Sequence, residues 1–240
     1  MPRSLWRTTF LTAILFSFLL TPTLFPQEKS DIRRQIADAY GFSTWPEVEL
    51  IRYTWNMEEG KEKVAHTWTW EPKTDRVTFE GKDKAGKPVK VTYTRGQMTL
   101  EIVKDTDPDF INDQYWLVFP FHLVWDKDAT VEDKGMATAP MAKGKARKVT
   151  VTYPKKGGGY TPGDSYDLYV GANNRVVVWV YHESGTAKDS LISTWTDYKM
   201  AGPILVAHDH RGTEEGKPLR IYFTDVAVKL TGSDALVPAK

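Results

Sequence analysis

The stretch VELIRYTWNM, residues 48–57, alternates apolar with polar side chains, and KVAHTWTWEP, residues 63–72, repeats the alternation after a short charged turn. A period of two places every second side chain on the same face of a β-strand. DRVTFEG (75–81) and PVKVTYTRG (88–96) continue the pattern after two further turns. Strands joined by such short turns pair antiparallel, so this part of the chain is predicted to form an antiparallel meander.

The last third of the chain returns to strand-like sequence, in YDLYVG, RVVVWVYHE, LISTWTDYKM, ILVAHDH and LRIYFTDVAVKL. Residues 175–183 carry apolar side chains on both faces of the expected strand, and residues 219–230 do much the same. Such a strand must be covered on both sides, or one of its faces must line a cavity. The whole pattern predicts a mainly β protein of about ten strands, and it gives a first indication of a space for a ligand.

One helix is expected in front of the sheet, in SDIRRQIADAYG (30–41). Its first two residues can cap a helix, Ile32, Ile36 and Tyr40 share one face, and Gly41 is a typical stop. The sequence therefore predicts a single short amphipathic helix at this end of the chain.

The N-terminus has the layout of a secretory signal peptide. Arg3 and Arg7 precede an apolar block from Phe10 to Leu20. That block is shorter than the roughly 20 residues that a membrane-spanning helix needs, so it favours export over a membrane anchor. We expect residues 1–23 to be a signal peptide that directs the protein to the periplasm or another extracytoplasmic part of the envelope. No internal repeat divides the rest, and residues 24–240 are predicted as one β domain.

Charge and cysteine content exclude several classes of protein. The chain has a formal net charge of +1, with Lys and Arg scattered among Asp and Glu. This distribution argues against nucleic acid as a partner and against a polybasic membrane-binding face. Because there is no cysteine, the chain cannot carry the lipid-bearing N-terminal Cys of a bacterial lipoprotein, and it has no cysteine nucleophile.

The HDH sequence at residues 208–210 is the strongest signal for a metal. If it lies in a strand, His208 and His210 point to one face and could share a zinc ion. No third ligand follows at a recognisable spacing, so polar residues at a strand end are the favoured interpretation. A metal-dependent hydrolase centred on these two histidines is kept as an alternative. The other three histidines are isolated, and we expect them to be core or surface residues.

Other motifs with possible chemistry fail on detail. DTDPDFIND (105–113) suggests a calcium loop, but Phe110 and Trp116 stand where that loop needs Gly and Glu. We expect an acidic turn or a helix cap there. KKGGGYTPGDS (155–165) lacks the Gly-Lys-Ser/Thr of a phosphate-binding loop and is expected to connect a hairpin. No catalytic residue, metal or cofactor is predicted.

Three segments together resemble the LolA/LolB superfamily of lipoprotein carriers: NDQYWLVFPFHLVWD (112–126), YDLYVGANNRVVVWVYHE (166–183) and WTDYKMAGPILVAHDHRG (195–212). The final T-D-V-x-V (224–228) is similar to the closing strands of that family. The resemblance implies a half-closed antiparallel barrel around a helix, with an apolar concave face closed by a lid. Carriers of this kind hold acyl chains in that cavity and release them to a partner. No functional residue of the carriers matches a position here by motif.

The apolar run YWLVFPFHLVW (115–125) is too short to span a membrane and too apolar to lie in water. Pro120 should break a long regular helix there, because it removes a donor and clashes with the preceding turn. We expect the run to pack on the concave face of the curved sheet as core or lid. The residues predicted to border an apolar pocket are Trp68, Trp70, Tyr115, Trp116, Phe119, Phe121 and Trp125.

These observations predict a soluble exported protein that binds a lipid, or an acyl chain of a lipoprotein, without catalysis. A membrane-associated donor or acceptor protein is the expected further partner. The first alternative is a structural or interaction module of the cell envelope whose core is filled with side chains. The hydrolase described above is the second.

Overall fold

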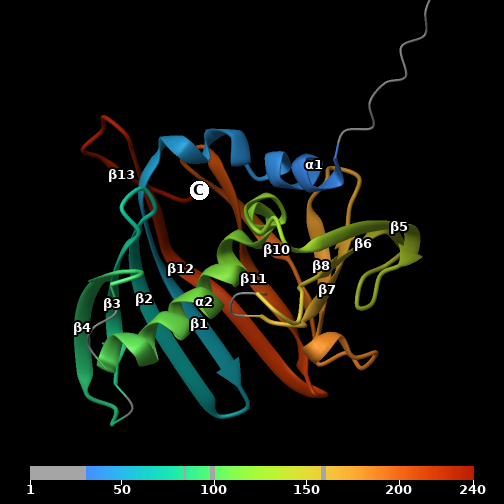
Figure 1. Cartoon of the computed structure of the whole chain (residues 1–240), viewed down its shortest axis with the longest axis horizontal. Helices are drawn as coiled ribbons and strands as arrows, with labels where there is room; N and C mark the ends of the chain where they lie inside the picture. The colour runs from blue at the N-terminus through green and yellow to red at the C-terminus, as the bar shows by residue number, and fades with distance from the viewer. Residues whose placement is uncertain (1–30, 84, 98–100, 158–160) are drawn as a thin grey trace, which may run out of the picture.

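The computed structural model describes residues 31–83, 85–97, 101–157 and 161–240, in which one antiparallel sheet curves around a long helix (Figure 1). The predicted signal peptide lies outside these residues, so export and signal cleavage stay predictions. Within the described ranges, no helix is long and apolar enough to cross a membrane.

Thirteen strands form the sheet. The first meander consists of β1 (Val48–Glu59), β2 (Glu62–Glu71), β3 (Arg76–Lys82) and β4 (Pro88–Thr94). The middle strands are β5 (Thr130–Thr138), β6 (Lys145–Thr152), β7 (Ser165–Val170), β8 (Val176–His182) and β9 (Leu191–Thr194). The closing strands are β10 (Thr196–Ala201), β11 (Ile204–Glu214), β12 (Lys217–Leu230) and β13 (Leu236–Pro238). The mainly β class and the antiparallel meander are confirmed.

The strand order brings the end of the chain back to its beginning. It runs β4-β3-β2-β1-β12-β11-β9-β8-β7-β6-β5, with β10 paired to β11 and β13 paired to β12. Because β4 and β5 stand at the two ends of this order, the sheet is curved but not closed. This is the half-closed architecture that the carrier resemblance implies.

The strand count exceeds the expected ten for a local reason. LISTWTDYKM is not one strand, because Trp195 separates β9 from β10. β9 pairs with β8 and with the far end of β11, whereas β10 pairs with the near end of β11. A short 3₁₀ turn, η2 (Glu183–Gly185), follows β8, and β13 has only three residues. Such short elements leave little periodic signal in the sequence.

The predicted N-terminal helix is confirmed as α1 (Ile32–Ala39), which is followed by the 3₁₀ helix η1 (Phe42–Glu47). The Asp31 side chain caps α1 by accepting a hydrogen bond from the backbone N–H of Arg33 at 3.0 Å. Gly41 joins the two helices in the left-handed region, with φ of 88°. A Cβ at this position would lie 2.4 Å from the carbonyl oxygen of Pro203.

The second α-helix, α2 (Glu101–Trp125), crosses the inside of the curved sheet (Figure 1). It contains the whole apolar run and also the acidic residues before it, so the expectation of a polar turn or cap at residues 105–113 is wrong. Val118 leaves helical geometry, with φ of −127° and ψ of 22°, two residues before Pro120. Pro120 therefore accompanies a kink but does not end the helix.

The Gly41 contact predicts a measurable difference between two glycines. Gly41→Ala should destabilise the fold more than Gly60→Ala, because both positions are left-handed but only Gly41 has backbone atoms in the way of a Cβ. The left-handed conformation alone costs an L-residue about 1–2 kcal/mol, and Gly41→Ala should exceed this value. Urea unfolding of both variants checks the difference. Equal losses of stability would contradict the steric argument.

Candidate functional site

Helix α2 packs its aromatic side chains onto the aromatic concave face of the sheet. Phe110 meets Trp68 of β2 at 5.4 Å between ring centroids, and Trp116 meets Trp179 of β8 at 4.6 Å. Phe119, which is fully buried, lies 4.9 Å from Tyr166 of β7. The apolar run is therefore part of the core, as the sequence predicts, and α2 fills the middle of the concavity.

A buried carboxylate fixes the middle of α2 to β2. The residue Asp113 is only 1% exposed. Its Oδ2 lies 2.7 Å from His66 Nδ1 and accepts a hydrogen bond of 2.7 Å from Trp68 Nε1. Asn112 donates to the other carboxylate oxygen at 3.1 Å. Because a buried charge is costly unless it is paired and hydrogen-bonded, this set of donors holds α2 at one position on the sheet.

A second carboxylate of the acidic stretch anchors the first half of α2. Asp107, also 1% exposed, accepts hydrogen bonds from Tyr93 Oη and Arg95 Nε, each at 3.0 Å. The Arg95 guanidinium also lies over the ring of Phe110 at 5.6 Å. The residues that imitate a calcium loop in the sequence are thus, in part, the polar contacts that dock a helix onto β4 and its following turn.

Both members of the His66–Asp113 pair have raised pKa values. Burial raises the pKa of the Asp113 carboxyl above its ordinary value, although the donors around it act in the opposite direction. Burial acts to lower the pKa of His66, but the hydrogen bond and the charge of Asp113 outweigh it and leave the pKa raised. The imidazolium form of His66 is therefore favoured beside the carboxylate.

A hydrogen-bonded network joins the two halves of α2 across the kink. Asp126, just after the helix, accepts hydrogen bonds through Oδ2 from Tyr153 at 2.7 Å and from Tyr115 at 3.1 Å. His122 Nδ1 lies 3.0 Å from the same oxygen, and its Nε2 lies 3.1 Å from Gln114 Oε1. Since Tyr153 follows β6, the network also ties the end of α2 to the middle strands.

The charge in this network resides on Asp126. Burial acts to raise the pKa of Asp126, but its hydrogen bonds, the one from His122 first, outweigh burial and leave the pKa lowered. Burial raises the pKa values of Tyr115 and Tyr153, and the charge of Asp126 adds to this effect. Both tyrosines therefore stay protonated and act as donors to an ionised carboxylate.

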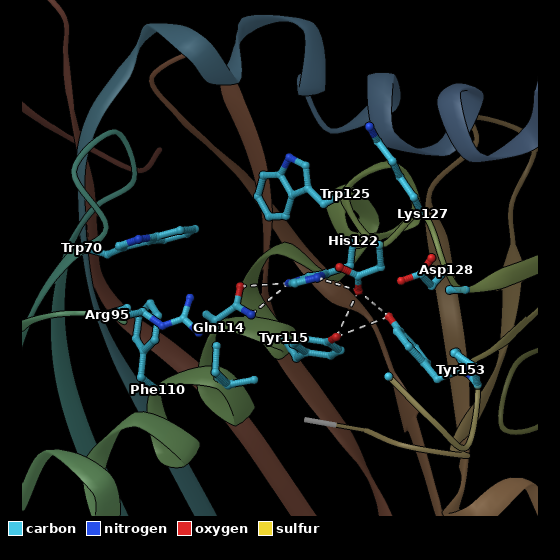
Figure 2. A pocket seen from close by; sticks show the side chains of 15 residues that line it. Trp70, Arg95, Phe110, Gln114, Tyr115, His122, Trp125, Lys127, Asp128 and Tyr153 are labelled. Atoms are coloured by element: carbon cyan, nitrogen blue, oxygen red, sulfur yellow. Dashed lines mark hydrogen bonds and ion pairs between the residues drawn. The ribbon is translucent and has the colours of Figure 1, made fainter. Parts of the chain in front are cut away.

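The network forms one side of a pocket of about 450 Å³, named here the Trp125 pocket. Figure 2 shows Trp70, Arg95 and Phe110 on one side of it and Tyr115 and Tyr153 toward the other. Trp125 extends the aromatic part of the wall, while the exposed Lys127 and Asp128 lie at the rim. The pocket wall is thus mainly aromatic, with Arg95 on one side and the Asp126 network on the other as its polar groups.

A second pocket, the Trp179 pocket, lies on the other side of the same helical ridge and measures about 290 Å³. Ile111 and Tyr115, one helical turn apart, contribute to the walls of both pockets. Trp116 and Trp179 supply the aromatic part of the second wall. The two pockets are the space that α2 leaves unfilled on its two flanks.

The seven predicted pocket residues separate into two groups. Trp70, Tyr115 and Trp125 line the Trp125 pocket, and Tyr115 lines the Trp179 pocket together with Trp116. The others are buried in the packed core, where they hold α2 and its surroundings in place: Trp68, Phe119 and Phe121. Whether any of the seven binds a ligand stays a prediction.

Several wall residues escape the sequence analysis, and two of them belong to the half of α2 that looks like a polar loop. Phe110 and Gln114, one turn apart, line the Trp125 pocket, and His122 faces Gln114 from beyond the kink. The signal that could have found them is the helical spacing of Val103, Asp107 and Phe110, all buried. This helical spacing becomes visible only if aspartates are allowed among the buried positions.

The two histidines of the hydrolase alternative lie in the core. His210 is 1% exposed and its ring packs between those of Trp116 and Trp195, at 5.4 and 4.7 Å. Burial lowers the pKa of His210 to about 3 and also lowers the pKa of His208. Among the described residues, no group of three or more His, Cys, Asp or Glu side chains is arranged to hold a metal ion.

No known family model and no curated protein matches this chain. Two solved structures align with most of it. A DUF1329 family protein from Desulfovibrio piger covers 86% of this chain and 97% of its own, with 9% identity and a TM-score of 0.45. The Mycobacterium tuberculosis lipoprotein LppX covers 81% of this chain and 94% of its own, with 6% identity and a TM-score of 0.29. Likeness at this level does not assign a ligand.

The His66–Asp113 pair predicts a pH-dependent stability. Because the folded pKa of His66 is raised, its contribution is fully present below the unfolded value of 6.5 and is lost as pH rises through the folded pKa. The pKa of Asp113 is also raised, so its contribution to stability likewise decreases as pH rises above its unfolded value of 3.8. Stability measured by urea unfolding should therefore fall as pH rises above 6.5.

His66→Gln, which keeps a donor for Asp113 but does not titrate, should flatten this pH dependence. His66→Leu should cost about 3–5 kcal/mol, as expected when one partner of a buried charged pair is removed. A wild-type slope that persists in His66→Gln would show that another group titrates.

Proposed function

We propose that this protein binds a lipid, or the acyl chain of a lipoprotein, in the Trp125 pocket, without catalysing a reaction. The observation that carries the proposal is the character of that pocket. The middle of the concave face is filled by α2, yet a space of about 450 Å³ is left beside Trp70, Phe110 and Trp125. Small-molecule sites commonly measure about 300–1,000 Å³ and are mostly apolar with a few placed polar groups.

The two sides of the pocket suit an amphiphile. Trp70 and Phe110, with centroids 5.6 Å apart, offer fixed aromatic surface to an acyl chain. Opposite them, the hydroxyls of Tyr115 and Tyr153 are engaged with Asp126, so their rings contribute area while the charge stays satisfied. Lys127 and Asp128 at the rim remain in water, where a polar headgroup would emerge.

Binding rather than catalysis fits the state of the titratable groups around the pocket. Asp126, His122 and Gln114 are engaged with one another or with tyrosines, and the Arg95 guanidinium is bonded to Asp107. In this arrangement these groups build the pocket wall and hold α2 in place, which is the role that the proposal gives them. The exported location and a membrane-associated donor or acceptor belong to the same proposal, on the strength of the signal-peptide layout and the carrier resemblance.

One observation favours the alternative of a filled interaction module. The side chains at the contact of α2 with the sheet leave little space, since Trp68, Phe110 and Phe119 are at most 1% exposed. On that interpretation the two pockets are incidental gaps beside a packed helix. The alternative and the binding proposal differ in whether an apolar ligand enters the Trp125 pocket.

Displacement of a fluorescent fatty acid from the purified mature protein tests this difference. Trp125→Ala should weaken binding about tenfold, because it removes a large part of the apolar wall that the chain would cover. Tyr222→Ala is the matched control. Tyr222 pairs with Asn56, whereas Trp55 pairs with Phe223, so the side chains of Tyr222 and Trp55 lie on different faces of the sheet. It should leave the affinity unchanged. No uptake by the wild type, or equal weakening in both variants, would favour the filled module.

A further inference from the structure

The hairpin formed by β5 and β6 carries the two large apolar side chains with the highest exposed fractions among the described residues. Met136 is 64% exposed and Met141 is 55% exposed, more than any other large hydrophobic residue that the structure describes. Both lie within one short segment, and Met141 is in the turn between the strands. Scattered exposed apolar residues are ordinary, but the two most exposed on the same hairpin call for an explanation.

In this hairpin, small apolar side chains are buried and large ones are exposed. At the turn end of the hairpin the side chains packed on the sheet are small: Ala139 and Ala146 are buried in a separate cluster with Tyr169, Val178 and Val180. The two large apolar side chains of the same hairpin are left in water. Because the alanines make the attachment, the methionines are not needed to hold the hairpin on the sheet.

The backbone at Met141 adds a second sign. Its φ is 59°, in the left-handed region that glycine adopts without penalty and other residues rarely do. Glycine would therefore suit this turn better than methionine. A long apolar side chain is kept at a position where the backbone disfavours it, which is common where a residue serves a purpose other than stability.

Basic residues outnumber acidic ones in the β5–β6 hairpin, residues 130–152, by five to two. The segment KGMATAPMAKGKARK (134–148) contains five Lys or Arg residues and no acidic residue, although the whole chain has a net charge of only +1. Lys134 pairs with Glu132 of its own strand, while Arg147 and Lys148 pair with carboxylates of the neighbouring strands β5 and β7. The other two, Lys143 and Lys145, are exposed and form no ion pair within the part of the chain that the structure describes.

Although the overall charge distribution argues against a polybasic face, we propose that the β5–β6 hairpin docks this protein onto an anionic lipid surface through two methionines and two lysines. Unbranched methionine side chains adapt to an irregular apolar environment, and lysines can keep their ammonium groups among headgroups while their stems lie lower. Anionic membranes attract each nearby lysine with roughly a fivefold gain in affinity. The inference extends the proposed function, since it brings the pocket to the membrane where a lipid would enter or leave.

Co-flotation of the mature chain with vesicles tests the proposal. The wild type should bind vesicles of phosphatidylcholine mixed with phosphatidylglycerol more tightly than vesicles of phosphatidylcholine alone, and added salt should weaken the binding. Met136→Ser with Met141→Ser should reduce binding about tenfold. Lys143→Gln with Lys145→Gln should reduce it roughly fivefold per lysine, on anionic vesicles only.

Matched controls come from other parts of the surface. Met200→Ser removes a methionine that is 46% exposed on β10, and Lys61→Gln with Lys87→Gln removes the same charge from exposed turns of the first meander. Both should bind like the wild type. Met141→Gly provides the folding control, because it relieves the left-handed backbone and should bind more weakly without any loss of thermal stability.

Three results would overturn the docking proposal: no vesicle binding, equal loss in hairpin and control variants, or a loss explained by a dimer through the β5 edge in sedimentation. Fatty-acid displacement distinguishes the docking proposal from the proposal of ligand binding in the Trp125 pocket. Hairpin variants should take up fatty acid in solution like the wild type. If no fatty acid enters the wild type but vesicle binding depends on the hairpin, the pocket proposal fails and the docking proposal holds.

Discussion

Asp113 brings a carboxylate into an aromatic core, and the position of α2 depends on the donors that surround it. His66 and Trp68 both reach its Oδ2 at 2.7 Å. These partners come from the concave face of β2, so the helix cannot slide or rotate without leaving a buried charge unpaired. An apolar helix on an apolar sheet would have many nearly equivalent positions. The buried pair selects one of them, and the pockets take their shape from that choice.

Both pockets lie beside α2, whose residues Ile111 and Tyr115 line each of them. α2 places Trp116 and Phe119 against the middle strands and Phe110 against the first meander. The ridge of Ile111 and Tyr115 is left between the two flanks. The kink at Val118 then turns the second half of the helix, and Asp126 is tied to Tyr115 and Tyr153. One wall of the Trp125 pocket is therefore built by the hydrogen-bonded network that joins the two halves of α2 across the kink.

The sequence predicts those parts of the fold whose side chains sort by polarity. The alternation in β1 to β4 is recovered because Tyr53, Trp68 and Phe79 face the core at matching register, with polar neighbours between them. α1 is recovered from its cap and from Gly41. The first half of α2 is missed because Asp107 and Asp113 are buried. These polar residues fix the helix on the sheet, and they interrupt the apolar periodicity by which a helix is predicted.

The same limit applies to the candidate site. Trp70, Tyr115 and Trp125 can be predicted as wall residues because large aromatic side chains in apolar runs must be buried or line a space. Trp68 and Phe121 satisfy the same rule and turn out to be core, since polarity alone cannot say which rings meet helix α2 and which face a gap. Tyr153 has no signal of its own. It joins the pocket through a hydrogen bond to Asp126, a contact between residues 27 positions apart.

A filled concavity and the proposed binding in the Trp125 pocket are compatible once the cost of moving α2 is considered. A ligand that fits the Trp125 pocket leaves the Asp113 contacts intact. A larger one would need the space that α2 occupies, and it would have to offset the exposure of Trp116 and Phe119 and the separation of His66 from Asp113. Raising the pH removes the proton that makes this pair attractive, so the energy that keeps α2 in place decreases. On the proposed function, the ion pair that fixes α2 would therefore also limit the size of a ligand that leaves the helix in place.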